Sequence, residues 1–140
     1  MTDVPQLCEL LALLFAQEAD FTPNLQHQSR ALEMIIGQPE VGRVFCAVAS
    51  GSVIGMVSIL FTVSTAEGGR AAWLEDMVVH PDHRGAGVGE RLLQTAIAGA
   101  KTAGGTRITL LTDATNHAAQ KFYGRAGFVR SQMVPLRLKL

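Results

Sequence analysis

Residues 84–89 read R-G-A-G-V-G, which suits the binding of an anion. The apolar residues 77–79 before them have the pattern of a buried strand, so the segment predicts a strand, a glycine turn and the start of a helix. Glycines let main-chain N–H groups approach a ligand, and a helix N-terminus presents unpaired donors and a positive dipole end. Arg84 adds a planar set of donors. The pattern therefore predicts a phosphate or pyrophosphate site.

Two common nucleotide motifs fit this segment poorly. A triphosphate-binding loop requires a lysine after its glycines, and none follows here. The dinucleotide motif G-x-G-x-x-G begins well at Gly85 and Gly87, but its third position is Glu90. Asp113, which follows the next expected strand, lies roughly where a ribose-binding acid would be. A small dinucleotide-binding module therefore stays open as a weaker interpretation.

A second motif lies downstream, where residues 116–123 read N-H-A-A-Q-K-F-Y and a G-F pair follows at 127–128. This segment is similar to the second signature of the Gcn5-related N-acetyltransferase (GNAT) family, N-x-x-A-x-x-F-Y with a trailing G-F. Arg84, Gly87 and Gly89 also match that family's cofactor loop of Arg or Gln, two residues, Gly, one residue, Gly or Ala. Two motifs in this order and at the usual separation are far more specific than either alone.

The resemblance implies an α/β fold with a mixed sheet, the GNAT acyl-CoA N-acyltransferase fold, and acetyl-CoA as co-substrate. In that family two parallel strands diverge, and the pantetheine arm pairs with the backbone of the first, as in β-augmentation. Asn116 is expected to hydrogen-bond the pantetheine. The implied cofactor-binding residues are Met77, Val78, Val79, Arg84, Gly85, Ala86, Gly87, Val88, Gly89, Asn116, Ala119, Phe122 and Tyr123.

Three residues are candidates for catalysis. The resemblance implies that Tyr123 contacts the thioester sulfur, where a proton donor would help the thiolate to leave. Glu75 and Asp76 are adjacent carboxylates in the central strand, and regular alternation predicts that they point to opposite faces. Only one would then face the reaction as a general base, with Glu75 slightly preferred.

The expected activity is transfer of an acetyl group from acetyl-CoA to a primary amine. Direct attack would form a tetrahedral intermediate, and the N–H of Met77 or Val78 would stabilise its oxyanion. A non-catalytic acyl-CoA sensor remains an alternative. The motifs do not identify the acceptor, so small-molecule amines and peptide amines both stay open.

The 140 residues predict a single domain. Residues 1–70 would form two helices and a hairpin on the acceptor side, 71–128 the acetyl-CoA-binding core, and 129–140 a C-terminal strand. The family usually has one strand before its first helix, and this chain begins at the helix. A missing strand leaves a sheet edge open, which favours a homodimer.

Hydrophobic periodicity predicts the order of the elements. A first helix runs from Asp3 to about Glu18, a second from Thr22-Pro23 to Gly37, and the apolar side of the second contains Leu25, Leu32, Ile35 and Ile36. The other expected elements are strands at 44–49, 53–63 and around 73–79, a helix from 88 to about 103, a parallel strand at 108–111, and a helix from Asn116 to Gly127.

Composition excludes several classes of function. Lys plus Arg equals Asp plus Glu, at 12 each, so no basic field favours nucleic acid or a membrane surface. No apolar run approaches the length of a membrane span, and the chain is expected to be cytoplasmic. Cys8 and Cys46 are expected to pack in the core as free thiols. His80, Asp82 and His83 do not converge enough to predict a metal site.

Overall fold

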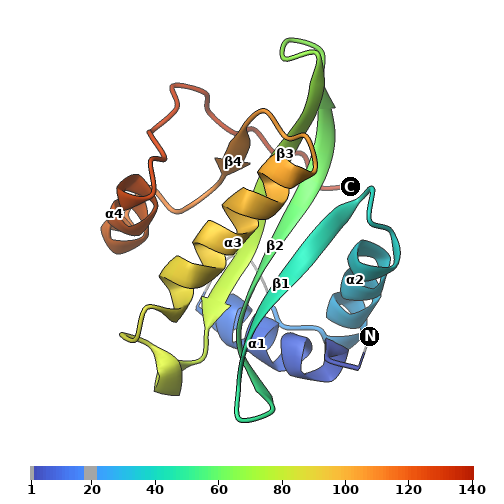
Figure 1. The fold of residues 1–140 in the computed structure, drawn as a ribbon, viewed down its shortest axis with the longest axis vertical. Helices are drawn as coiled ribbons and strands as arrows, with labels where there is room; N and C mark the ends of the chain where they lie inside the picture. The colour runs from blue at the N-terminus through green and yellow to red at the C-terminus, as the bar shows by residue number, and fades with distance from the viewer. Residues whose placement is uncertain (1, 18–21) are drawn as a thin grey trace.

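The computed structural model describes residues 2–17 and 22–140 and contains a four-stranded mixed sheet of order β1-β2-β3-β4 (Figure 1). The α/β fold with a mixed sheet that the sequence predicts is confirmed, and no strand precedes the first helix among the described residues. The elements are α1 (Val4–Ala16), α2 (Leu25–Gly37), β1 (Gly42–Ala49), β2 (Ser52–Ser64), β3 (Gly69–Val79), a 3-10 turn (Pro81–His83), α3 (Val88–Thr102), β4 (Ile108–Leu110) and α4 (His117–Arg125).

The first two strands form an antiparallel hairpin, as their alternating pattern predicts. Ser50 and Gly51 connect them, and both have positive φ, 50° and 78°. Two consecutive residues of positive φ are typical of the tight turn that matches the right-handed twist of a hairpin. The local sequence is therefore enough to place this element.

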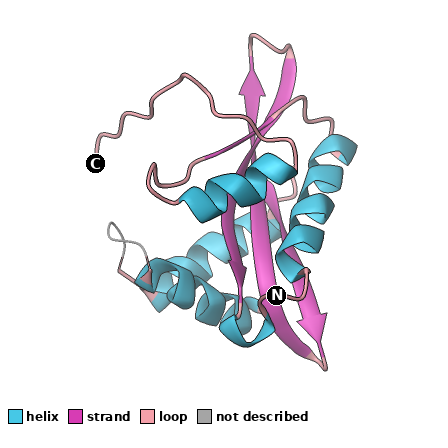
Figure 2. Ribbon diagram, turned by 90° about the vertical axis from the view of Figure 1, so that its left-hand side faces the viewer, coloured by secondary structure: helices cyan, strands magenta, loops and turns pink. Residues whose placement is uncertain are grey.

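Helices cover both faces of the sheet (Figure 2). α1 and α2 pack on one face through an apolar cluster that includes Leu7, Leu32 and Met56. α3 packs on the other face, where Leu93 and Ala96 are buried. The adjacent β2 residues Met56 and Val57 lie in different clusters, because successive residues of a strand point to opposite faces.

The two parallel strands diverge, as the resemblance implies. β4 pairs with β3 only from Ala72 to Leu74, whereas β3 continues to Val79. The β4-facing edge of residues 75–79 therefore has no strand beside it among the described residues. This divergence leaves main-chain groups of the central strand available to another extended chain.

Helix boundaries differ in detail from those expected. α1 ends at Ala16, and the expected end near Glu18 lies outside the described residues. α2 begins at Leu25 instead of near Thr22, because the side chain of Asn24 accepts a hydrogen bond from the His27 N–H and caps the helix. Leu25 is 67% exposed, so it does not belong to the buried face of α2.

Two expectations about burial and strands are wrong. Residues 129–140 form no strand, and their apolar side chains are exposed. This tail runs away from the sheet (Figure 2), and Pro135 removes one of the donors that a ladder would need. Cys46 is exposed on the edge strand β1, whereas Cys8 is buried, and both are free thiols. The expected homodimer stays a prediction.

Within the described residues, no helix has the length and apolar character needed to cross a membrane.

Candidate functional site

The glycine segment forms a turn in the left-handed region, directly before α3. Gly85 and Gly87 have φ of 79° and 81°, and Gly87 is the N-cap of the helix. A Cβ at either position would meet nothing within 4 Å, so the turn has open space around it. Here glycine is required by conformation, because an L-residue in this region costs about 1–2 kcal/mol. The turn can therefore present the first N–H groups of α3 to an anion.

Arg84 lies exposed at the mouth of this turn and ties it to the central strand. Its Nε donates a hydrogen bond to the Val79 carbonyl oxygen at 3.0 Å. That bond uses one of the five guanidinium donors, so the terminal nitrogens can still turn toward a phosphate. The single arginine therefore fixes the position of the loop and keeps cationic donors for a ligand.

The hydrogen-bond ladder determines which backbone groups of β3 face the open edge. The His80 N–H donates a hydrogen bond to the Ile54 carbonyl oxygen at 2.8 Å. Two residues along each strand, Val78 is paired with Met56 in the same register. Hydrogen-bonded pairs alternate with non-bonded pairs in an antiparallel ladder, so Val78 also directs its N–H and C=O toward β2. The backbone groups of Met77 therefore face the opening.

The two carboxylates of the central strand share one face, contrary to the expectation from simple alternation. Leu74 packs in the α3 cluster, so Glu75 points to the α1 and α2 face. A register shift between Met56 and Ser58 places an extra residue in β3, and Asp76 has φ of 54°. Asp76 also lines a pocket with α1 and α2. The bulge therefore adds a second carboxylate to the same side.

Ser58 holds this bulge from the neighbouring strand. Its side chain is buried, and its Oγ lies 3.1 Å from the Glu75 carbonyl oxygen and 3.4 Å from Oδ2 of Asp76. Glu75 is an exposed residue by surface area, but neighbouring atoms partly desolvate its carboxyl and raise its pKa above the ordinary value. A raised pKa suits a group that must take up a proton near neutral pH.

The second signature forms α4 and packs against the glycine segment. Tyr123 is partly buried, with its ring centroid 5.1 Å from that of Phe122 and 5.7 Å from that of Phe128. Burial raises the pKa of Tyr123 to about 12, so its hydroxyl keeps its proton at physiological pH. An added Cβ on Gly89 would contact the Phe122 ring at 3.6 Å. The two motifs therefore meet in the fold.

Asn116 acts as a helix cap in this structure. Its Oδ1 accepts a hydrogen bond from the Ala119 N–H at 3.0 Å. This bond satisfies one of the free donors at the start of α4. A contact of Asn116 with pantetheine would therefore use its amide nitrogen.

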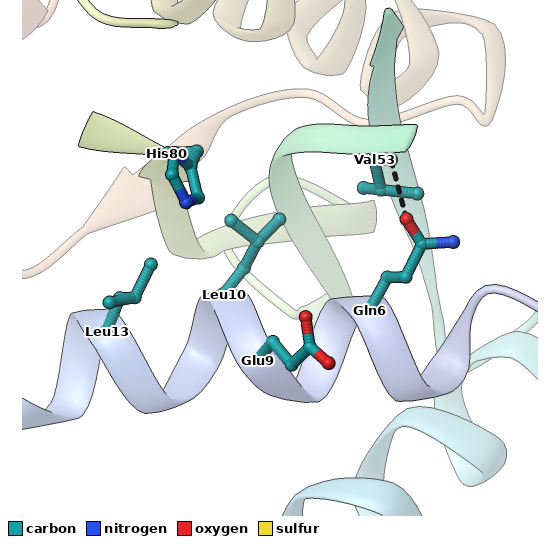
Figure 3. Close-up of a pocket in the computed structure, with 6 residues that line it drawn as sticks. All are labelled: Gln6, Glu9, Leu10, Leu13, Val53 and His80. Atoms are coloured by element: carbon teal, nitrogen blue, oxygen red, sulfur yellow. Dashed lines mark hydrogen bonds between the residues drawn. The ribbon is translucent and has the colours of Figure 1, made fainter. Parts of the chain in front are cut away.

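Two pockets open on the α1 side of the sheet. One, of about 250 Å³, is lined by Gln6, Glu9, Leu10, Leu13, Val53 and His80 (Figure 3). Gln6 is already engaged there, since its Oε1 accepts a hydrogen bond from the Val53 N–H at 2.8 Å. The other, of about 220 Å³, is lined by Leu11, Phe15, His27, Gln28, Ala31, Leu32, Ile35 and Asp76.

The sequence alone assigns Gln28 no specific contact. Gln28 is 6% exposed and is the buried residue one turn before Leu32 on α2. Its amide Nε2 has no hydrogen-bond partner among the described residues. The available signal was position, because Gln28 fills the helical spacing between Leu25 and Leu32 where an apolar residue is expected.

The histidine loop makes local contacts. His80 Nδ1 accepts from the Asp82 N–H at 3.2 Å, and the His80 and His83 rings are 6.0 Å apart. Among the described residues, no three His, Cys, Asp or Glu side chains are placed to share a metal ion.

The fold and these motifs define an α/β protein with a divergent parallel strand pair and a glycine turn at its end. A family model described as Acetyltransferase (GNAT) family matches residues 6–128. The chain therefore belongs to the GNAT acetyltransferase family.

Curated proteins and solved structures resemble this chain in sequence or in fold. Glucosamine 6-phosphate N-acetyltransferase of Trypanosoma brucei brucei is 32% identical over 101 residues, 71% of this chain and 66% of that protein. An integron cassette protein from the mobile metagenome of Cole Harbour salt marsh has a TM-score of 0.86 at 29% identity, covering 99% of this chain and 86% of its own. A predicted acetyltransferase with acetyl-CoA from Clostridium acetobutylicum shares the fold, with a TM-score of 0.80 at 19% identity and coverage of 97% and 90%.

Proposed function

We propose that this chain is an N-acetyltransferase that uses acetyl-CoA to acetylate a primary amine. The observation that carries the proposal is the open edge of β3 beyond Leu74, which leads directly into the left-handed turn before α3. An extended amide chain can pair with the open edge of β3, and a pyrophosphate can bind the turn before α3. Residues 84–89 with Met77 are the main-chain part of this cofactor site, and Ala119, Phe122 and Tyr123 of α4 are its other wall.

Acetyl-CoA would supply an activated acyl group whose thiolate can leave. The Met77 N–H faces the open edge, so it is the strand donor that we assign to the oxyanion of a tetrahedral intermediate. The Tyr123 hydroxyl, held neutral by burial, would donate its proton or a hydrogen bond to the leaving sulfur. These are the two residues that we place at the reacting atoms on the cofactor side.

The acceptor amine would approach from the α1 and α2 face, where Glu75 and Asp76 lie together. An amine arrives protonated and must lose a proton before its lone pair can attack the thioester carbon. We assign the proton transfer to Glu75, through a water, because partial desolvation raises its pKa toward the range useful for a base. Asp76 would attract and orient the ammonium group.

We infer from the family that the acceptor is a primary amine. The T. brucei brucei relative is named for glucosamine 6-phosphate, and this chain spans just under two thirds of that protein's length. Amino sugars are therefore one group of candidates in a screen, together with amino acids, polyamines and peptide N-termini.

Thermal unfolding with acetyl-CoA, CoA or NAD tests the cofactor, since a ligand that binds only the folded state raises its apparent stability. We expect a shift with both CoA species and none with NAD. Thiol release with an amine panel then tests transfer. Binding without thiol release for any amine would indicate an acyl-CoA sensor, and protection by NAD alone would indicate a dinucleotide-binding module.

A further inference from the structure

The pocket between α1, α2 and the β3 bulge is lined by Gln28, whose buried amide N–H donor has no hydrogen-bond partner among the described residues. Gln28 is 6% exposed, and the donor is Nε2 of its amide. A buried polar group without a partner is costly, so such groups in folded proteins call for an explanation. The side chain lines the pocket, so a rotation of the side chain would bring the amide nitrogen to a bound molecule, which can supply the missing acceptor.

The lining of the pocket combines apolar and polar side chains. Five of its eight lining residues are apolar: Leu11, Phe15, Ala31, Leu32 and Ile35. The polar lining residues are His27, Gln28 and Asp76. None of the described residues that line it is a lysine or arginine. The pocket therefore suits a small apolar body and offers no permanent cation to a phosphate.

The pocket adjoins the reaction position. Asp76 lines it and directly precedes Met77, whose N–H we assign to the oxyanion. An amine nitrogen held by the Asp76 carboxylate would lie beside the open edge of β3, while the rest of the molecule would extend between the helices toward Gln28.

We propose that this pocket selects the acceptor, and that Gln28 is its specificity-determining residue. The inference rests on the proposed acetyltransferase function. The acceptor is a primary amine with an unphosphorylated apolar body and a neutral oxygen acceptor, such as an amide carbonyl, that accepts from the Gln28 amide N–H. Amino acid amides and peptide N-termini with apolar side chains fit this description, whereas amino sugar phosphates do not.

The test compares two amines that differ in the group proposed to contact Gln28. Leucinamide has a primary amine, an isobutyl group and a carboxamide, and 3-methylbutylamine lacks the carboxamide. In the variant Gln28→Met, which keeps the shape but removes the amide, KM for leucinamide should rise about 10-fold, while KM for 3-methylbutylamine should change less than about 2-fold. Wild type should prefer leucinamide to 3-methylbutylamine and to glucosamine 6-phosphate.

The matched control is Gln26→Met, the same substitution at an exposed position of the same helix. It should leave both KM values unchanged. Equal effects of Gln28→Met on the two amines, or preference for glucosamine 6-phosphate, would overturn the inference while the acetyltransferase proposal stands. Acetyl-CoA binding without thiol release for any amine would remove both.

A second measurement does not depend on turnover. Removing an unpaired buried amide should stabilise the ligand-free protein, so Gln28→Met should raise Tm by roughly 2–4 °C. Gln26→Met should leave Tm within about 1 °C. A fall in Tm for Gln28→Met would show that the amide is paired within the fold, and the proposed ligand contact would be withdrawn.

Discussion

The two halves of the proposed site are built in different ways. The cofactor half is built mainly on β3, the turn and α3, which are consecutive in sequence, with α4 as its other wall, and its ligand groups are mainly backbone N–H donors. The acceptor half is assembled from α1, α2 and the β3 bulge, and its chemistry depends on side chains. The difference predicts that the cofactor half should be sensitive to backbone conformation, and the acceptor half to the identity of single polar groups.

The largest effect is expected at Gly87. Gly87→Val places a β-branched residue at φ of 81° directly before α3, so the turn must change shape. We expect the Kd for acetyl-CoA, measured by calorimetry, to rise by about 100-fold or more, because several N–H donors move together. Gly124→Ala is the control, since Gly124 lies within α4 with nothing within 4 Å of an added Cβ. If Gly87→Val binds normally, the turn does not hold the pyrophosphate.

Arg84→Ala should have the next largest effect on the cofactor half. Loss of the guanidinium removes both the bond to Val79 and the proposed phosphate contact. We expect a 10- to 30-fold increase in the Kd for acetyl-CoA, equivalent to roughly 1.4–2 kcal/mol, and a weaker dependence of Kd on salt. Lys101→Ala, at the far end of α3, should leave Kd unchanged. An Arg84→Ala Kd equal to that of wild type would contradict the phosphate role.

Tyr123→Phe separates chemistry from cofactor binding. The ring remains to pack against Phe122 and Phe128, while the hydroxyl is lost. We expect kcat to fall about 10-fold or more, with the Kd for acetyl-CoA changed less than about 2-fold. Because burial raises the Tyr123 pKa to about 12, the hydroxyl should stay protonated up to about pH 10. Unchanged turnover would remove Tyr123 from the reaction.

Asp76→Asn tests the acceptor half by removing a single negative charge. The substitution keeps the size of the side chain and removes the charge that we assign to the ammonium group. KM for the amine should rise about 5- to 10-fold, and the Kd for acetyl-CoA should stay the same. Steady-state kinetics with a varied amine, beside a binding measurement, checks both. If the Kd for acetyl-CoA rose as much as the KM for the amine, Asp76 would act on cofactor binding as well as on acceptor binding.

The smallest expected effect is on stability, at Glu75. Partial desolvation raises the Glu75 pKa in the folded state, so folding favours the protonated carboxyl. That contribution is complete below the ordinary pKa of 4.5 and is lost as pH rises through the raised folded value. Glu75→Gln should therefore gain Tm relative to wild type between about pH 4 and pH 7, by roughly 1 °C. A pH-independent difference in Tm would argue against the raised pKa.

The same variant should also report on the reaction. If Glu75 is the base, the Glu75→Gln enzyme should lose kcat/KM and the acidic limb of its pH profile. An acidic limb that persists in Glu75→Gln would transfer the role of base to another group.

Elements that depend on neighbouring residues could be predicted from the sequence. The hairpin at Ser50-Gly51, the turn at Gly85 and Gly87, and the αβ unit after it all follow from glycine chemistry and hydrophobic period. The sequence failed where geometry depends on distant partners. Residues 133–140 alternate as a strand would, yet the tail forms none, because a strand must also lie alongside a sheet edge, and this tail runs away from the sheet (Figure 2).

What the sequence by itself determined is the position and chemistry of the cofactor segment, since its donors belong to a continuous stretch whose conformation glycine specifies. Only the tertiary structure decided how the acceptor half is arranged. The bulge that places Asp76 on the same face as Glu75 depends on the pairing of β3 with β2. The burial of Gln28 depends on the packing of α2 against α1 and the sheet. Both follow from long-range packing, in which a residue's environment is set by segments far away in the chain.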